Sequence, residues 1–435
     1  MVLIITSAVT ERLRYICHLI FKEQLGIDFR FSTQLNQPAL PEQIVIHYHH
    51  HPCPAEQLQV KPHALLFEKG VSLQTIDVFD FVSIADSGKL IPAFFKTSDN
   101  AFSFDIFAAA FFLLSRYEEY LTDEKDEYGR FPHVTSVAYK NQFLSLPLVN
   151  IWIAEMAAWL KHHHSTLDLH TKKFEPLVTY DIDMAWSYRN KGLWRNLAGW
   201  FREPDSERIN VLMGKSTDPF DCYDYISDCE IHSKNKSILF FLAAADRSRY
   251  DKNISPSQPE MIKLIQQFSG SFQIGWHPSW NSYGKPVMLE KEKKTLSAII
   301  EKQVIQSRQH YIKLQLPKTY QLLLQAGIKK EYSMGYGSIN GFRASFAGSY
   351  LWYDLHSEQS TELRIYPFCY MDANSRFEQK QTVAASLDEI SYYWQVCRGN
   401  NGLFISIFHN HLMGNNQEGL SWRKVHQHLI SLIQQ

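Results

Sequence analysis

Two aspartates, Asp181 and Asp183, follow an apolar run at residues 177–180 with one residue between them. If the strand conformation continues through them, both carboxylates face one side and lie about 6–7 Å apart along the chain. Two carboxylates this close can divide the work of a hydrolytic site, one binding a metal ion and the other acting as a base. Alternatively, the pair closes the strand as turn or helix-capping aspartates.

A histidine stands at the end of a second apolar run. His277 follows residues 272–276 and precedes Pro278, which ends a strand because proline lacks the backbone donor. A strand-end histidine in an aromatic setting is a candidate metal ligand or acid–base group. The alternative is a structural histidine whose ring is satisfied by hydrogen bonds.

A third apolar run, residues 403–408, leads into His409, and His411 lies two positions further on. Each strand end taken singly has a structural explanation, but three strands that all end in titratable groups form a stronger pattern. Ligand sites of βα architectures collect at the carboxyl ends of the strands. We therefore predict one site that contains Asp181, Asp183, His277 and His409.

Two arginines follow the second histidine motif. Arg308 lies in the segment SRQH and Arg343 in the segment GFRAS, after a glycine-rich turn. An arginine beside the aspartate pair would keep the base ionised and oriented. A surface salt bridge is the alternative for either residue.

The elements that must position these groups fall into two regions. Residues 1 to about 120 mix short apolar runs with polar and proline-rich turns. Here we expect strands at 2–5, 43–47, 64–67 and 90–95, and helices at 104–121 and 149–164. The polar stretch STLDLHTKKFEP then separates this region from the rest, so we predict an N-terminal α+β domain at residues 1–172 and a second domain at 173–435.

From residue 174 onward, apolar runs alternate with helical patterns, which indicates an α/β fold with a parallel sheet or a βα barrel. Residues 187–228 interrupt this rhythm and are expected to form an insertion over one face. The predicted strands are 177–180, 237–242, 272–276, 311–314 and 403–408, and the predicted helices are 261–268, 290–307, 319–326 and 386–397.

Composition narrows the class of protein. Lys and Arg total 44 against 45 for Asp and Glu, so no basic excess exists to bind nucleic acid. Aromatic residues make up 14% of the chain, which suits sugar stacking as well as core packing. Six scattered cysteines without a CxxC pair predict reduced thiols and a cytoplasmic location. Neither a signal peptide nor a run of about 18 apolar residues is found, so no membrane span is expected.

The order of strand-Asp-x-Asp, strand-His-Pro-Ser, arginine and final strand-His resembles the NodB-homology domain of the polysaccharide deacetylases, carbohydrate esterase family 4. The resemblance covers about residues 174–435. It implies an incomplete (β/α) barrel that removes acetyl groups from N-acetylated saccharides with a divalent metal, usually zinc. It also implies Asp181 as the general base, Asp183 and His277 as metal ligands and His409 as the general acid.

The arginine that contacts the base in this family corresponds to Arg308 by its order in the chain, or to Arg343 by its local sequence. Polar and aromatic neighbours of the motifs are expected to bind the substrate, namely Trp276, Trp280, Asn281, His310 and His411. Upstream, residues 109–131 (AAFFLLSRYEEYLTDEKDEYGRF) resemble an uncharacterised domain that precedes such deacetylase-like domains in some bacterial proteins.

One position departs from the family pattern. The second motif of the family supplies two histidines four residues apart, and here Asn281 stands at the second place. Asparagine is a poorer zinc ligand than imidazole. Either His310, His409, His411 or another residue completes the site, or the metal is weak, or the domain has lost hydrolysis.

The predicted function is a metal-dependent hydrolase of the linear amide C–N bond in an N-acetylated saccharide. The alternative is a saccharide-binding protein that keeps the fold without catalysis. A metal-dependent amidase or glycosidase on the same barrel is a third possibility, because a fold does not fix a function.

Overall fold

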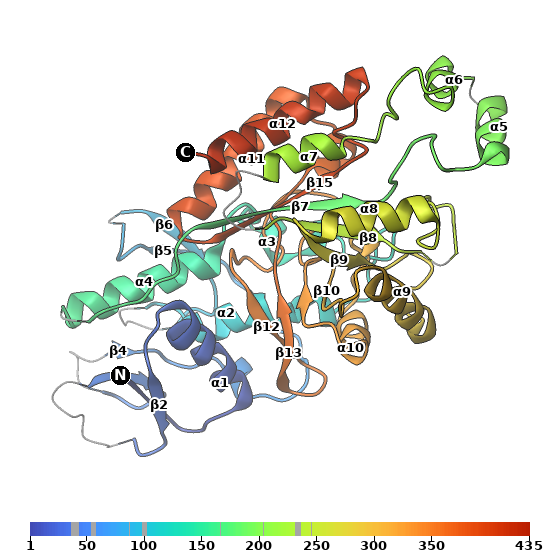
Figure 1. Cartoon of the computed structure of the whole chain (residues 1–435). Coiled ribbons are helices and arrows are strands. Elements are labelled where there is room, and N and C mark those ends of the chain that lie inside the picture. The colour runs from blue at the N-terminus through green and yellow to red at the C-terminus, as the bar shows by residue number, and fades with distance from the viewer. Residues whose placement is uncertain are drawn as a thin grey trace.

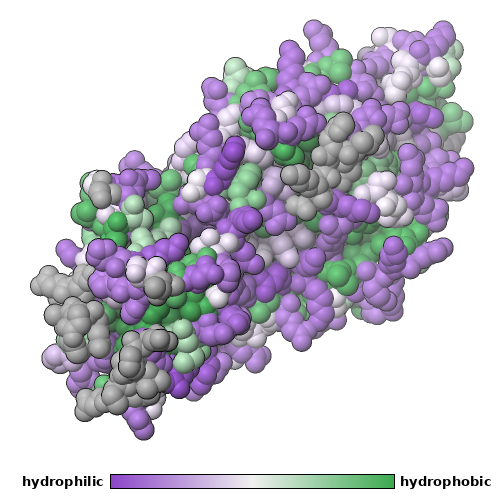
Figure 2. Space-filling model, turned by 60° about the vertical axis from the view of Figure 1, so that its left-hand side comes forward, coloured by the Kyte–Doolittle hydropathy of each residue, from purple (hydrophilic) through white to green (hydrophobic). Residues whose placement is uncertain are grey.

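The computed structural model describes residues 1–35, 43–53, 58–86, 88–97, 102–165, 167–202, 204–230, 236–244 and 246–435. Two largely parallel sheets and the helices around them make up a mixed α/β structure (Figure 1). In the described part of the chain, every helix is too short or too polar to cross a membrane. Hydrophilic residues cover most of the face seen in Figure 2, with hydrophobic residues in smaller patches between them.

The first sheet contains four parallel strands in the order β2-β1-β3-β4. A separate antiparallel pair, β5 with β6, lies outside it. The strands are β1 (Val2–Thr6), β2 (Phe29–Ser32), β3 (Ile44–Tyr48), β4 (Leu58–Gln59), β5 (Phe79–Val82) and β6 (Leu90–Ala93), and the α-helices are α1 (Glu11–Cys17), α2 (Ile106–Leu114), α3 (Val137–Lys140) and α4 (Leu148–His163). The strand predicted at 64–67 is wrong, because the His63 side chain accepts from Leu65 N and caps a 3₁₀ turn, η2 (Ala64–Leu66).

The second sheet has nine strands in the order β12-β13-β11-β10-β9-β8-β7-β15-β14. Every neighbouring pair is parallel except β12 with β13. Among the described strands no pairing joins β12 to β14, so the sheet remains open. Its strands are β7 (Glu175–Ile182), β8 (Ile238–Leu242), β9 (Gln273–His277), β10 (Gln306–Ser307), β11 (Lys330–Glu331), β12 (Tyr350–Asp354), β13 (Gln359–Ile365), β14 (Tyr370–Met371) and β15 (Leu403–His409).

Helices cover the outer side of this sheet. Helices α7, α11 and α12 lie together near β7 and β15, and α8, α9 and α10 follow around the other strands (Figure 1). Their bounds are α7 (Tyr223–Glu230), α8 (Pro259–Ser269), α9 (Pro286–Ile299), α10 (Lys318–Gln325), α11 (Val383–Gly399) and α12 (Gln417–Ile433). The insertion after β7 adds α5 (Leu193–Arg202) and α6 (Ser206–Leu212).

The alternation of side chains along the central strands decides which groups can meet. His409 aligns with Asp181, Asp181 with Phe240, and Phe240 with Gly275, so these four positions share one face of the sheet. Gly275 is required there, because a Cβ atom would lie 2.3 Å from the Phe240 ring. His277 lies two residues further along β9, so its side chain points to the same face of the sheet. We call this face the inner face.

Near residue 308, the structure shortens one predicted element and shows another to be wrong. The helix predicted at 290–307 corresponds to α9, which ends at Ile299. The strand predicted at 311–314 is not formed; the strand in this part of the chain is β10, which ends directly before Arg308. The chain turns sharply after Arg308, and Tyr311 and Ile312 have positive φ angles of 59° and 52°, which a strand does not allow. These residues form a 3₁₀ turn, η5 (His310–Ile312).

A buried ion cluster joins the N-terminal region to the second sheet. Glu119 accepts from Arg343 Nη2 at 2.6 Å and from Arg116 Nε at 2.8 Å, and all three side chains are buried. Burial alone would raise the pKa of Glu119, but the two guanidinium groups lower it to about 2. The carboxylate is therefore the shared counter-ion of two buried cations.

We expect Glu119→Gln to lower the free energy of unfolding by about 3–5 kcal/mol at neutral pH, since the buried Arg343 loses its carboxylate partner and the buried Arg116 keeps only Glu118. The folded pKa of Glu119 lies below its usual 4.5, so its stabilisation is complete above that value and is lost as the pH falls toward 2. The difference in the free energy of unfolding between wild type and Glu119→Gln should therefore become smaller as the pH falls from 4.5 toward 2. Urea unfolding followed by circular dichroism measures it. The exposed control Glu301→Gln should change stability by less than about 0.5 kcal/mol. A difference that stays constant with pH would contradict the role of this carboxylate.

Candidate metal and catalytic site

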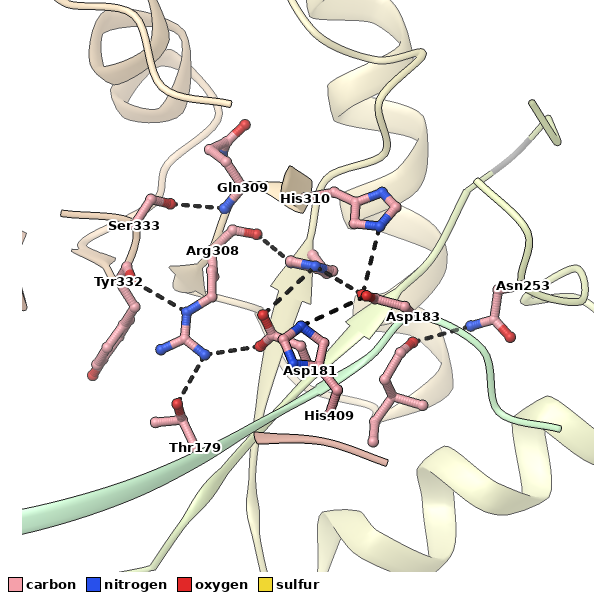
Figure 3. A network of polar contacts seen from close by, with 12 residues as sticks. Thr179, Asp181, Asp183, Asn253, Arg308, Gln309, His310, Tyr332, Ser333 and His409 are labelled. Atoms are coloured by element: carbon pink, nitrogen blue, oxygen red, sulfur yellow. Dashed lines mark hydrogen bonds and ion pairs between the residues drawn. The ribbon is translucent and has the colours of Figure 1, made fainter. Parts of the chain in front are cut away.

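The inner-face groups meet at the carboxyl edge of the second sheet (Figure 3). Asp181 is the second-to-last residue of β7, and Asp183 directly follows the end of that strand. His277 ends β9 and His409 ends β15, as the sequence predicted for the strand ends. His310 joins them from the turn after β10.

Asp183, His277 and His310 form a group suited to a metal ion. Each offers one ligand atom, and these atoms all lie within 4.8 Å of one another. His277 Nε2 lies 3.1 Å and His310 Nε2 3.6 Å from Asp183 Oδ1. That oxygen is buried and makes no hydrogen bond of acceptable geometry. One carboxylate and two imidazoles are a donor set that zinc prefers, so these residues fit a divalent cation.

Hydrogen bonds on the far side of each imidazole fix its orientation. His277 Nδ1 lies 2.6 Å from the carbonyl oxygen of Arg308, and His310 Nδ1 lies 3.1 Å from Asp251 Oδ1. A carbonyl and a carboxylate can only accept, so each Nδ1 carries the proton of its bond. Both Nε2 atoms are thereby directed at Asp183, which is the usual arrangement around a protein metal ion.

Arg308 holds Asp181 in place. Its Nη1 donates to Asp181 Oδ1 and to Thr179 Oγ1, both at 2.8 Å, and its Nε donates to the Tyr332 carbonyl. The guanidinium also lies 4.3 Å from the centroid of the Phe240 ring. Asp181 Oδ2, 3.8 Å from His277 Nε2, is left facing the metal group.

His409 is oriented by Asp372. The carboxylate accepts from His409 Nδ1 at 2.6 Å and from its backbone N–H at 2.8 Å. The other ring nitrogen, Nε2, lies 3.7 Å from Asp183 Oδ2. Burial alone would lower the pKa of His409, but Asp372 and the two site aspartates raise it to about 9. The ring is therefore a proton donor at neutral pH.

Asp183, His310 and His411 also have displaced pKa values. Burial would raise the pKa of Asp183, but His310, His277 and His409 hold it well below its usual range. Burial would lower the pKa of His310, whereas Asp183 and Asp251 raise it to about 9. A cation that binds to His310 must therefore displace its proton. His411 differs, because burial and the neighbouring His409 lower its pKa to about 3.

These groups line a cavity of about 170 Å³, smaller than the about 300–1,000 Å³ of pockets that enclose a whole drug-sized ligand. Arg130, from the N-terminal region, forms part of its wall. Arg130 Nη1 donates to the carbonyls of Tyr311 and Gly337 at 3.0 and 3.1 Å. The cavity can therefore take only a small part of a substrate, and the N-terminal region helps to enclose it.

Two of the predicted site residues lie elsewhere. Arg343 was one of two candidates to contact Asp181, but it pairs with Glu119 and with the Gly335 carbonyl, so the contact belongs to Arg308. Trp276 was expected to bind substrate. It occupies the opposite face of β9 from His277 and is fully buried in the core beneath the helices, so it does not reach the cavity.

The remaining substrate-binding predictions divide into two pairs. Trp280 stacks on Tyr250 at 4.0 Å, beside the cavity wall, and Asn281 contacts Asp251 through its backbone N–H, so neither is among the lining residues. His310 and His411 do line the cavity. His310 belongs to the metal group, in the role that the family pattern would give to position 281.

Three residues of the site were missed by the sequence analysis, namely Asp251, Asp372 and Arg130. Asp251 lies in the loop after β8, and Asp372 follows the two-residue strand β14. These two aspartates could have been suggested from the sequence only because each follows a strand, and ligand sites collect at the carboxyl ends of strands. A two-residue strand gives no recognisable alternation, and nothing local marks Arg130.

Comparisons with known proteins gave limited matches. A family of unknown function, DUF7033, matches residues 2–165. No curated protein matches the sequence. Among solved structures, a protein described as a polysaccharide deacetylase from Mycobacterium smegmatis is 12% identical with a TM-score of 0.40, covering 60% of this chain and 86% of its own. An allantoinase is 11% identical, with a TM-score of 0.39 and coverage of 60% and 84%. A polysaccharide deacetylase from Bacillus cereus is 10% identical, with a TM-score of 0.29 and coverage of 58% and 85%.

We expect the purified chain to bind one zinc ion per molecule, and His310→Ala to weaken that binding by more than about 100-fold. Even changes of residues behind a metal ligand cost about 10–100-fold in affinity, so loss of a ligand should cost more. Metal content by mass spectrometry and competition with a chelator measure the effect. Asn281→Ala is the matched control and should bind zinc as wild type does. The ligand assignment is wrong if Asn281→Ala loses the metal while His310→Ala keeps it.

Proposed function

We propose that this chain is a metal-dependent hydrolase of the polysaccharide deacetylase type, which removes N-acetyl groups from an amino-sugar-containing saccharide. The observation that carries the proposal is that Asp181 and His409 both border the Asp183–His277–His310 group, with Asp181 Oδ2 3.8 Å from His277 Nε2 and His409 Nε2 3.7 Å from Asp183 Oδ2. Each of the two flanking groups is held by its own buried partner, Arg308 or Asp372. A base and an acid that both border a metal group can supply the two proton transfers of amide hydrolysis.

Asp183, His277 and His310 would hold the cation. When bound, a divalent cation polarises an amide carbonyl and lowers the pKa of a water molecule. Asp181 accepts a proton at Oδ2, the oxygen that Arg308 leaves free. Arg308 fixes the direction of this carboxylate, so the base need not reorient during the reaction.

His409 supplies the second proton transfer, in which a proton is donated rather than accepted. Its Nε2 faces the cavity and donates a proton to the departing amine nitrogen. Asp372 fixes the ring through Nδ1 and stabilises its positive charge. An amide has a poor leaving group, so this protonation is necessary for the C–N bond to break.

The shape of the cavity favours a small acyl group. Its volume of about 170 Å³ suits an acetyl group better than a long acyl chain, and Met371 and Ile312 give it apolar lining. Tyr311 lies in the wall and stacks on Tyr128 at 5.4 Å. Phe377, 51% exposed, also belongs to the lining. Such exposed ring faces suit contact with a pyranose outside the cavity.

A catalytically inactive saccharide-binding protein was the alternative, because Asn281 replaces the expected second histidine. His310 offers an imidazole in its place, which removes the reason for preferring that alternative. We further propose that residues 173–435 form the incomplete (β/α) barrel of this enzyme type, and that residues 1–172 form an N-terminal α+β domain of unknown role that shares one continuous hydrophobic core with it.

We expect Asp181→Asn to reduce acetate release from N-acetylated oligosaccharides by about 10²–10⁴-fold, the usual contribution of a positioned general base. Zinc binding should be retained, because Asp181 is outside the ligand group. Acetate is measured enzymatically after incubation with a panel of N-acetylated oligosaccharides. The exposed control Asp168→Asn should act as wild type does. Undiminished acetate release by Asp181→Asn would rule out the assigned base.

We expect His409→Gln to impair amide hydrolysis far more than ester hydrolysis. A nitrophenolate leaves without protonation, so loss of the acid should cost about 10²-fold or more on the amide and less than about tenfold on nitrophenyl acetate. Steady-state kcat on both substrates tests this. Equal losses on the two substrates would show that His409 is not the acid.

A further inference from the structure

The insertion that follows Asp183 carries an exposed hydrophobic surface. Helices α5 and α6 stand apart from the sheet and the other helices (Figure 1). On α5, Trp194 is 86% and Phe201 77% exposed. We call the α5 apolar face the five exposed residues Leu193, Trp194, Leu197, Trp200 and Phe201. Exposed apolar clusters of this kind mark sites of interaction.

The orientation of α5 is the reverse of that in an ordinary surface helix. At about 100° per residue, the α5 apolar face spans an arc of about 120°, and Arg195 and Arg202 lie opposite. The polar side faces the protein. Asn196 is buried and its Nδ2 donates to the carbonyls of Tyr188 and Gly192, while Arg195 donates to the carbonyl of Lys252. The hydrophobic side is therefore directed away from the molecule.

Specific contacts hold this orientation. Arg208 of α6 donates to the Asn196 carbonyl at 3.0 Å. It packs so closely on α5 that a Cβ atom at Gly199 would lie 2.5 Å from its Nη1. The buried Asp218 carboxylate accepts from three successive backbone N–H groups, those of residues 187–189. The apolar face is thus presented by a structured unit.

Basic residues outnumber acidic ones in the insertion that carries the α5 apolar face. The segment 187–218 contains six lysines and arginines against four acids, in a chain whose formal net charge is −1. Exposed Arg247, Arg249 and Lys252 lie in the loop that contacts α5. Burial lowers the pKa of Lys191 to about 8, and Arg195, Arg208 and Lys252 add to this shift, so these cations lie within reach of one another.

We propose that α5 docks on an anionic membrane surface. Tryptophan, phenylalanine and leucine on one side of a helix with arginine and lysine around them are typical of helices that lie in the lipid interface. The apolar face would enter the boundary between head groups and acyl chains, and the basic side chains would contact lipid phosphates. A symmetric pair of chains on this face would instead bring the two basic insertions together, which like-charge repulsion disfavours.

Docking would also position the catalytic site. The insertion begins directly after Asp183, so α5 would hold the carboxyl edge of the second sheet next to the lipid surface. If the proposed hydrolase function holds, the substrate class is then a saccharide carried at a membrane. The binding test below needs no activity, so it can fail or succeed independently of the proposed function.

The test is co-sedimentation of the full chain with vesicles of phosphatidylcholine alone or mixed with phosphatidylglycerol, at low and high salt. We expect binding to the anionic vesicles that salt weakens. Trp194→Ser with Phe201→Ser should weaken it about tenfold or more, and Arg202→Gln with Lys215→Gln about fivefold or more. The matched controls Leu73→Ser with Val287→Ser, and Lys263→Gln with Lys291→Gln, change exposed residues elsewhere and should bind as wild type does.

Absence of vesicle binding would overturn the proposal, as would equal binding to neutral vesicles or wild-type binding by the Trp194→Ser, Phe201→Ser variant. Light scattering without lipid measures the oligomeric state, and so tests the competing explanation that this face joins two copies of the chain. If the wild type is a dimer that this variant dissociates, and anionic vesicles are not bound, the α5 apolar face joins two copies of the chain and the lipid assignment is wrong.

Discussion

The buried ion pair between Arg308 and Asp181 is the contact around which the site is arranged. A buried guanidinium is costly unless its charge is paired, and here Asp181 pairs the charge while Thr179 and the Tyr332 carbonyl accept from Nη1 and Nε. The same residue orients His277 through its backbone carbonyl. One arginine therefore fixes the proposed base and one proposed metal ligand together. Phe240 supports its guanidinium, and Gly275 leaves the space that Phe240 needs.

The sequence predicted the site residues where a strand was long enough to be recognised from its run of apolar residues. Asp181, His277 and His409 each end an apolar run of at least four residues, so their meeting at one sheet edge could be predicted from parallel strands alone. His310 follows a strand of only two residues, and Asp251 and Asp372 lie in loops, where no periodicity marks a side chain. The choice between Arg308 and Arg343 also required the structure, because both are arginines after turns and only their buried partners differ.

The N-terminal region and the second sheet are interdependent. One continuous hydrophobic core includes residues from Val2 to Leu429. Glu119 neutralises Arg343 from across this contact, and Arg130 closes the cavity wall over Tyr311. Removing residues 1–172 would therefore expose apolar surface, leave a buried cation unpaired and open the site. The boundary predicted near residue 172 marks a change in sequence pattern rather than a place where contacts are few.

His310 has a consequence for recognising related chains. The third residue of the proposed metal group comes from the turn after β10, two residues beyond the arginine that holds the proposed base, and not from the turn after His277. A genome search that requires two histidines four residues apart would discard such a chain as a degenerate copy. A search built on Asp-x-Asp, a single histidine after a glycine-containing strand, and a downstream Arg-x-His would retrieve it.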